Sequence, residues 1–130
     1  MNLTLNEHTY VTTNKLDIMT QFHVARKLGP ALSALEGLVN PDTLQAETDL
    51  LLLLIMSKLP DEDAEYVTRK CLGNVFRLQG NTKAKIMDGK GGLMFEDINL
   101  EDIMRLTVTV INESLGDFFR TALGNLATLT

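Results

Sequence analysis

Most of the chain places apolar side chains at the three- and four-residue spacing of amphipathic helices. The first such stretch carries Leu16, Met19, Phe22, Ala25 and Leu28. Asn14 precedes it as an expected N-cap, and Asp17 opposes the positive end of the helix dipole. We expect this helix to end at Gly29-Pro30, since glycine often follows a helix and proline seldom continues one.

Prolines in the first turn predict the next two helices. Pro30 can open a short second helix, because a first-turn proline loses no intrahelical hydrogen bond; its apolar positions are Leu32, Leu35 and Leu38. Asn40-Pro41-Asp42 repeats the device with an N-cap, a proline and an acid. This third helix is expected to run to about Lys58 and to be closed by Leu59-Pro60.

Acidic residues mark the start of two further helices. The fourth begins near residues 61–63 and is expected to continue through Val67, Cys71 and Val75, and as far as Leu78. The last begins after Asn99, where Glu101 and Asp102 suit a helix N-terminus, and Gly116 can kink it. Residues 124–130 carry little charge and no amphipathic pattern, so we expect this end to fray.

Two stretches have the character of strands or turns. Residues 3–12 alternate and carry β-formers around Asn6-Glu7, which predicts a short hairpin that must pack on the helices. The helical pattern fails at 79–97, which is either a flexible loop or a hairpin that pairs 85–87 with 93–95. The predicted fold class is mainly α: one domain, residues 1–130, with a bundle of about five helices, a short N-terminal β-hairpin and the optional second hairpin near residues 85–95.

Composition narrows the function classes. With 17 acidic and 12 basic residues in 130, the net charge is -5, which disfavours nucleic acid because the cations are scattered. The single cysteine, Cys71, allows no internal disulfide and suits a reducing compartment. The first residues show no export signal, and the longest apolar run is far short of the roughly 20 residues needed to cross a bilayer. A protein of the cytoplasm without membrane contact is expected.

No constellation of catalytic or ligand-binding residues is present. His8 and His23 have no second ligand at helical spacing, so no zinc signature exists. Residues 89–92 lack both the upstream glycine and the Ser or Thr of a phosphate-binding loop. The acids at 61–65 lack the spacing of a calcium-binding loop and are better explained as a helix start. We therefore expect no enzyme activity, metal or cofactor.

The most informative feature is the run of seven apolar residues from Leu50 to Met56. It covers nearly two helical turns, so this segment is hydrophobic all round. Each side chain left exposed forfeits roughly 1.5–3 kcal/mol, so either the other helices wrap it or a partner covers one side. Neighbouring phenylalanines near the C-terminus pose the same question. The residues expected to contact a partner or a second copy are Leu50, Leu51, Leu53, Leu54, Phe95, Phe118 and Phe119.

Several segments, in order along nearly the whole chain, resemble the small tail assembly chaperones of long-tailed bacteriophages of the lambda-like siphophage type. They are residues 22–32, the acidic helix start followed by residues 71–75, and residues 93–100 leading to the helix that contains residues 117–119. None is a catalytic fingerprint. The resemblance depends on their order and on the length of the chain.

This resemblance implies a mainly helical protein that binds the apolar tape measure protein, keeps it soluble and helps the tail tube protein polymerise around it. It also implies self-association, a longer form made by ribosomal frameshifting, and absence from the mature virion. Leucines and six methionines would supply an adaptable apolar surface. The alternatives are a minor structural or connector component of the virion, and a small helical adaptor or regulator.

Overall fold

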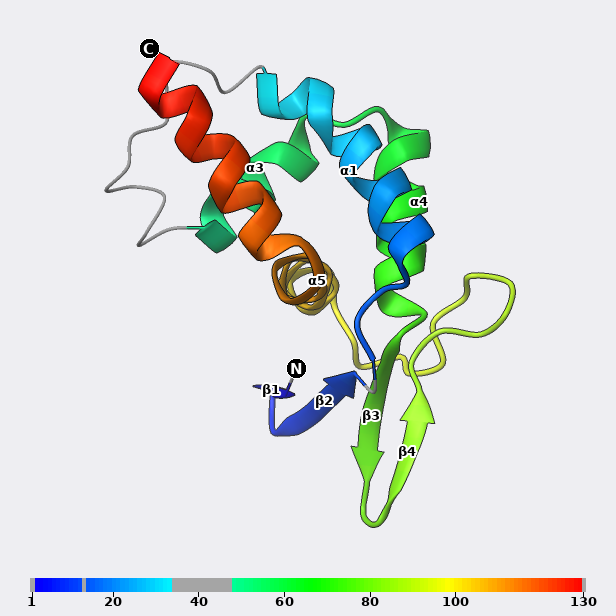
Figure 1. Ribbon diagram of the computed structural model, residues 1–130. Coiled ribbons are helices and arrows are strands. Elements are labelled where there is room, and N and C mark those ends of the chain that lie inside the picture. Colours follow the sequence, from blue (N-terminus) through cyan, green and yellow to red (C-terminus); the bar gives the residue numbers. More distant parts are fainter. Residues whose placement is uncertain (1, 13, 34–47, 130) are drawn as a thin grey trace.

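In the computed structural model, residues 2–12, 14–33 and 48–129 are described, and this part of the chain combines four helices with a four-stranded antiparallel sheet (Figure 1). The expected mainly α bundle of about five helices is therefore wrong, because the chain has a mixed α/β fold. The elements are β1 (Asn2–Leu5), β2 (His8–Thr12), α1 (Ile18–Ser33), α3 (Thr48–Ser57), α4 (Asp61–Leu72), β3 (Val75–Gln79), β4 (Thr82–Lys85) and α5 (Leu100–Leu129).

The predicted N-terminal hairpin is confirmed. Strands β1 and β2 pair antiparallel with Leu5 opposite His8, so Asn6 and Glu7 form a two-residue turn. Both turn residues are left-handed, with φ of 50° and 69°. Asn tolerates this conformation better than most residues, and such turns match the twist of the flanking strands.

Helix α4 is shorter than predicted, and residues that follow it form a strand of the sheet. Helix α4 ends at Leu72, and the chain enters β3 at Val75, where the expectation of a helix reaching Leu78 was wrong. Strand β3 pairs with β2, so that Arg77 lies opposite Tyr10, and then with β4 through a turn at Gly80, whose φ is +62°. The strand order β1-β2-β3-β4 joins two hairpins that are far apart in the sequence.

Helix α1 begins later and ends later than expected. The carboxylate of Asp17 accepts the backbone N–H of Thr20 at 2.9 Å, so Asp17 caps the helix instead of Asn14. The helix passes through Gly29 and Pro30 to Ser33, so the predicted end at this pair is wrong. The second short helix and the first part of the third fall largely on residues 34–47, which lie outside the described residues.

The 79–97 stretch is partly strand and partly an ordered turn. Beyond β4, Met87 forms a β-bridge with Leu93, and the N–H of Met94 donates to the carbonyl of Ile86 at 2.8 Å, so the hairpin alternative is confirmed in part. The carboxylate of Asp88 accepts the N–H groups of Lys90 and Gly92, each at 2.8 Å. These bonds lower the pKa of Asp88.

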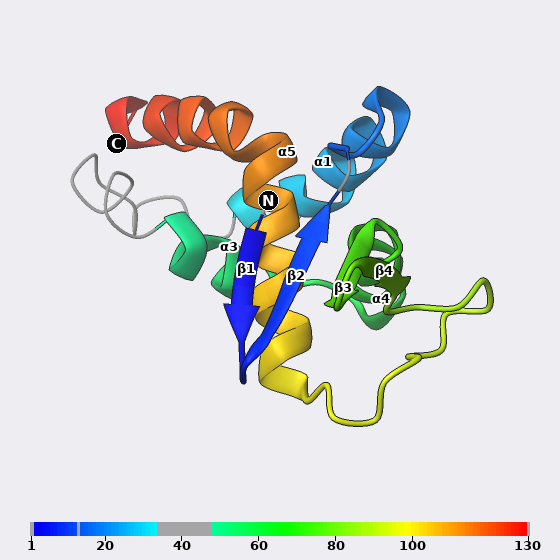
Figure 2. The same cartoon turned by 90° about the horizontal axis from the view of Figure 1, so that it is seen from below.

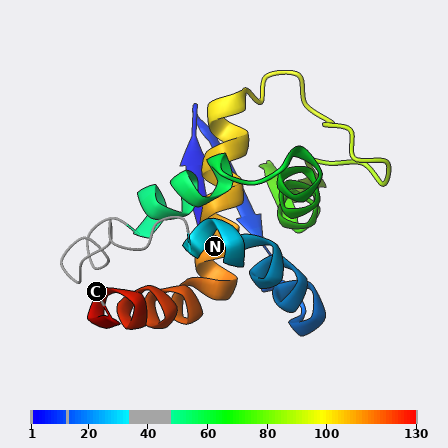
Figure 3. The same cartoon turned by 90° about the horizontal axis from the view of Figure 1, so that it is seen from above.

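Helix α5 is the element against which the other helices pack. Helices α3 and α4 both pack against α5 (Figure 3). Strands β1 and β2 lie in front of its first half in Figure 2. Figure 2 also shows a bend in the orange part of α5. The start after Asn99 is confirmed, whereas the expected fraying of residues 124–130 stays a prediction. Fully buried core side chains include Tyr10, Val24, Leu28, Ile55, Val67, Leu72, Ile86, Leu106 and Ile111.

Candidate functional site

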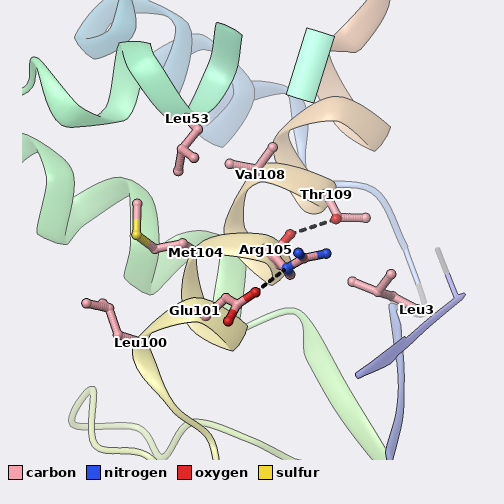
Figure 4. A pocket seen from close by; sticks show the side chains of 8 residues that line it. All are labelled: Leu3, Leu53, Leu100, Glu101, Met104, Arg105, Val108 and Thr109. Carbon is pink, nitrogen blue, oxygen red and sulfur yellow. Dashed lines mark hydrogen bonds and ion pairs between the residues drawn. The ribbon is translucent and has the colours of Figure 1, made fainter. Parts of the chain in front are cut away.

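An apolar groove lies along the first half of α5. Its first section has a volume of about 570 Å³ and lies between β1, α3 and α5 (Figure 4). The apolar side chains that line it come from all three elements, and the polar ones come from α5. They are Leu3, Leu53, Leu100, Met104 and Val108, with Glu101, Arg105 and Thr109.

A second section of about 410 Å³ continues the groove toward α4. The two sections share Leu53, Leu100, Met104 and Val108, so they are neighbouring parts of one depression. The α4 section adds Met56, among other residues. Met104 lines both sections, and its unbranched side chain can adapt to a bound segment.

Helical periodicity explains the floor of this groove. Leu100, Met104 and Val108 are four residues apart, so they lie along one line on α5. Leu100 is 71% exposed and Val108 only 5%, so the line descends from an open end into the core. The wall opposite comes from α3, where Leu53 is half-buried and the neighbouring Ile55 is fully buried.

A polar rim borders the apolar floor on α5. The carboxylate of Glu101 pairs with Nε of Arg105 at 3.2 Å, and both side chains are well exposed. The hydroxyl of Thr109 donates to the carbonyl of Arg105 at 2.6 Å. Exposed pairs of this kind contribute little to stability, roughly 0.3–0.5 kcal/mol, so they can rearrange around a bound segment at small cost.

An ion pair between the buried Arg77 and the half-exposed Asp97 joins the sheet to the chain that leads into α5. Arg77 is only 5% exposed, and its guanidinium donates to the carboxylate of Asp97 at 2.8 and 3.0 Å. The same group lies 2.8 Å from Nε2 of His8 and 4.3 Å from the ring centroid of Phe95. The Arg77 hydrogen bonds lower the pKa of Asp97, whereas burial raises the pKa of Tyr10.

A second polar contact fixes the N-terminus of α5 against the first hairpin. Asn99 caps the helix by accepting the N–H of Asp102 at 2.9 Å. Asp102 is buried, and both of its carboxylate oxygens accept the side-chain amide of Asn6 at 3.1 Å. Because β1 adjoins this turn, the contact also sets the position of Leu3 across the groove from Leu53.

The residues predicted to contact a partner lie in different parts of the structure. Leu53 lines both sections of the groove, and Leu54, 42% exposed, does not line it. Phe95 is half-buried and packs against the core beneath Arg77. Phe118 is 56% exposed on the second half of α5. The side chains of Leu50, Leu51 and Phe119 lie outside the described part of the structure.

Most of the residues that line the groove were not predicted from the sequence. Leu100, Met104 and Val108 form a stripe at four-residue spacing that a helical projection of residues 100–108 could have found. Leu3 could not have been found in this way, because its place opposite α3 depends on how the hairpin packs. Of the apolar residues at 50–56, Leu53 lines the groove and Ile55 is buried in the core.

The described residues offer little for catalysis. No group of three or more His, Cys, Asp or Glu side chains in this part of the chain could hold a metal ion. Burial raises the pKa of the Cys71 thiol to about 12, which keeps it protonated and unreactive at neutral pH. None of the described helices is both long and apolar enough to cross a bilayer.

A family model described as phage tail assembly chaperone protein, TAC, matches residues 6–127. The matched range includes Leu53, Leu100, Met104 and Val108 of the groove, and Leu3 precedes it. Neither the curated proteins nor the solved structures contain a significant match.

Proposed function

We propose that this chain, which belongs to the family of phage tail assembly chaperone proteins, binds an apolar segment of the tape measure protein in the groove along α5. The family expected from the sequence is confirmed by the match over residues 6–127. In this proposal the chain keeps the tape measure protein soluble and promotes polymerisation of the tail tube protein around it.

The groove is the observation that carries the proposal. Apolar side chains from β1, α3 and α5 converge on one trough, and Leu100 stands exposed at its open end. Contiguous apolar surface of this kind is typical of protein-binding sites. Four client side chains of leucine size would contribute roughly 6–12 kcal/mol, which can offset the cost of association, about 4–15 kcal/mol.

Several features of the proposal follow from the chaperone role. The protein acts in the host cytoplasm, associates with further copies and with a longer frameshifted form, and leaves before the virion is complete. The net charge of -5 supports this role, because charge repulsion keeps a protein soluble while its apolar groove is open. Detection of the chain in purified virions would instead indicate a structural component.

Co-expression with a tape measure fragment tests the site. Leu100→Glu combined with Met104→Glu places two carboxylates on the apolar floor, so the fragment should become insoluble and no longer co-purify. Since Leu100 is exposed and begins α5, where acids are favourable, the fold should persist. The amount of soluble fragment and its recovery with the affinity-tagged chaperone are measured.

The matched control is Ile18→Glu, which changes an apolar residue of similar exposure, 74%, that does not line the groove. This variant should retain the fragment. If Ile18→Glu abolishes binding while the double groove variant keeps it, the client site lies elsewhere and the proposal is wrong.

A further inference from the structure

The sheet has an outer face that carries apolar and cationic side chains. Its inner face contains Leu3, Tyr10 and Arg77, which pair in one row across β1, β2 and β3 and are packed or buried. Because successive side chains of a strand point to opposite faces, the neighbours of this row face outward. The next row places Phe76 opposite Val11 on one side and Lys85 on the other.

The outward row is only partly covered. Val11 and Phe76 are half-buried, yet neither packs against the described hydrophobic core. Leu78 points to the same face and is 37% exposed. The helices lie on the other side of the first two strands in Figure 2. A strip of apolar surface therefore runs across β2 and β3 away from the groove.

Two lysines border this strip. In the register of β3 and β4, Lys83 lies opposite Leu78 and Lys85 opposite Phe76, and both lysines are exposed. The other outward residues of the described sheet are uncharged: Asn2, Thr4 and Thr9. The apolar strip is thus flanked by positive charge on one side, with no acid among the strand residues of this face.

No carboxylate of the described residues offsets the charge of these two lysines. The chain has a net charge of -5, and several of its cations have carboxylate partners. These pairs join Lys27 to Asp63, Arg69 to Glu65, Arg77 to Asp97 and Arg105 to Glu101. Within the described residues, Lys83 and Lys85 have no such partner. Their charge is available to an outside carboxylate.

We infer that this outer face, defined by Val11, Phe76, Leu78, Lys83 and Lys85, binds a protein segment that combines apolar side chains with carboxylates. Apolar contacts would cover Phe76 and Leu78, while carboxylates would pair with the two lysines. Charge complementarity selects an acidic partner and rejects a basic one. The inference goes beyond the proposed function, because this surface is separate from the groove and could be occupied at the same time.

Nuclear magnetic resonance of the full-length chain tests this inference with two synthetic peptides. One peptide alternates glutamate with leucine, and the other has lysine in place of each glutamate. The acidic peptide should shift the amide signals of Val11, Phe76 and Leu78, and added salt should weaken its binding. Absence of shifts on this face, or equal shifts with both peptides, would overturn the inference.

Charge reversal provides the second measurement. Lys83→Glu with Lys85→Glu should weaken the acidic peptide about tenfold, since two exposed ion pairs are lost and replaced by repulsion, and should favour the basic peptide. The control, Lys58→Glu with Lys90→Glu, changes two exposed lysines elsewhere by the same net charge. Equal weakening in the control would mean that only overall charge matters. Leu78→Ser, which keeps both lysines, should also lose affinity.

Discussion

Arg77 shows how one residue can hold two parts of the chain together. The buried guanidinium of β3 meets the half-exposed carboxylate of Asp97, just before α5. Its Nε atom has no hydrogen-bond partner within the described residues, so the bond to Asp97 is the main compensation for a buried charge. Removing the carboxylate would leave this cation in the interior, which proteins tolerate poorly.

We therefore predict that Asp97→Ala lowers the free energy of unfolding, by less than the loss of a partner from a fully buried pair because Asp97 is half exposed. In a chain that already carries Arg77→Met, the same change should cost much less, because no buried cation remains. Urea denaturation of the four proteins of this cycle measures both values. An equal cost of Asp97→Ala in the two backgrounds would show that the ion pair is not the cause.

The turn residue Asn6 combines a backbone role with a side-chain role. Its φ of 50° is left-handed, and its amide donates to both oxygens of the buried Asp102. Asn6→Gly keeps the backbone conformation and should lose about 1–2 kcal/mol with the hydrogen bonds. Asn6→Ala should lose roughly 1 kcal/mol more, because alanine is strained in this conformation.

Denaturation curves of the two variants separate these contributions. Glu7→Gly is the control, since Glu7 is also left-handed, with a φ of 69°, and glycine relieves that strain. This control should be at least as stable as the original chain. Equal stability of Asn6→Gly and Asn6→Ala would contradict the assignment of strain to this turn.

At the scale of elements, the sequence predicted those whose signals are local. The Asn6-Glu7 turn, the acidic start of α4 and the start of α5 after Asn99 each depend on a few neighbouring residues, and all three are confirmed. The Gly29-Pro30 signal is equally local but failed, because α1 continues through it to Ser33. Local turn and cap signals therefore do not determine every boundary. The predicted Asn14 cap of α1 was also wrong, whereas α3 ends at Ser57, close to its predicted end.

The sheet could not be predicted in the same way. Strand β3 has only five residues, and they directly follow a helix whose apolar spacing continues into Val75. What makes them a strand is pairing with β2, more than sixty residues earlier, where Val75 lies opposite Thr12. A local pattern contains no information on such a distant partner. The mainly α prediction failed for this reason.

The groove was difficult to predict from the sequence for the same reason as the sheet. Leu53 was predicted as a contact residue because excess hydrophobicity is visible in the sequence. Leu3 and Leu100 become part of the same surface only when β1 and α3 are placed on either side of α5. The groove is assembled from three elements that are distant in the sequence. For this reason only its α3 wall was predicted.

The whole molecule presents two surfaces of different chemistry. The groove is apolar with a paired polar rim. The outer face of the sheet is apolar with lysines that have no carboxylate partner in the described part of the chain. The two surfaces lie on opposite faces of the N-terminal hairpin, because Leu3 lines the groove and Val11 belongs to the outward row. A client in the groove should therefore leave the outer face accessible, which distinguishes this arrangement from one shared binding site.

Hydrogen–deuterium exchange of the chain with a tape measure fragment tests this arrangement. Binding in the groove should slow exchange in β1, in the end of α3 and at residues 100–109, because these segments form its walls and floor. Strand β4, which does not line the groove, should exchange at the same rate with and without the fragment. Protection confined to the second half of α5 would instead place the client beside Phe118. Protection of β4 with an unchanged groove would assign the client to the lysine-bordered face.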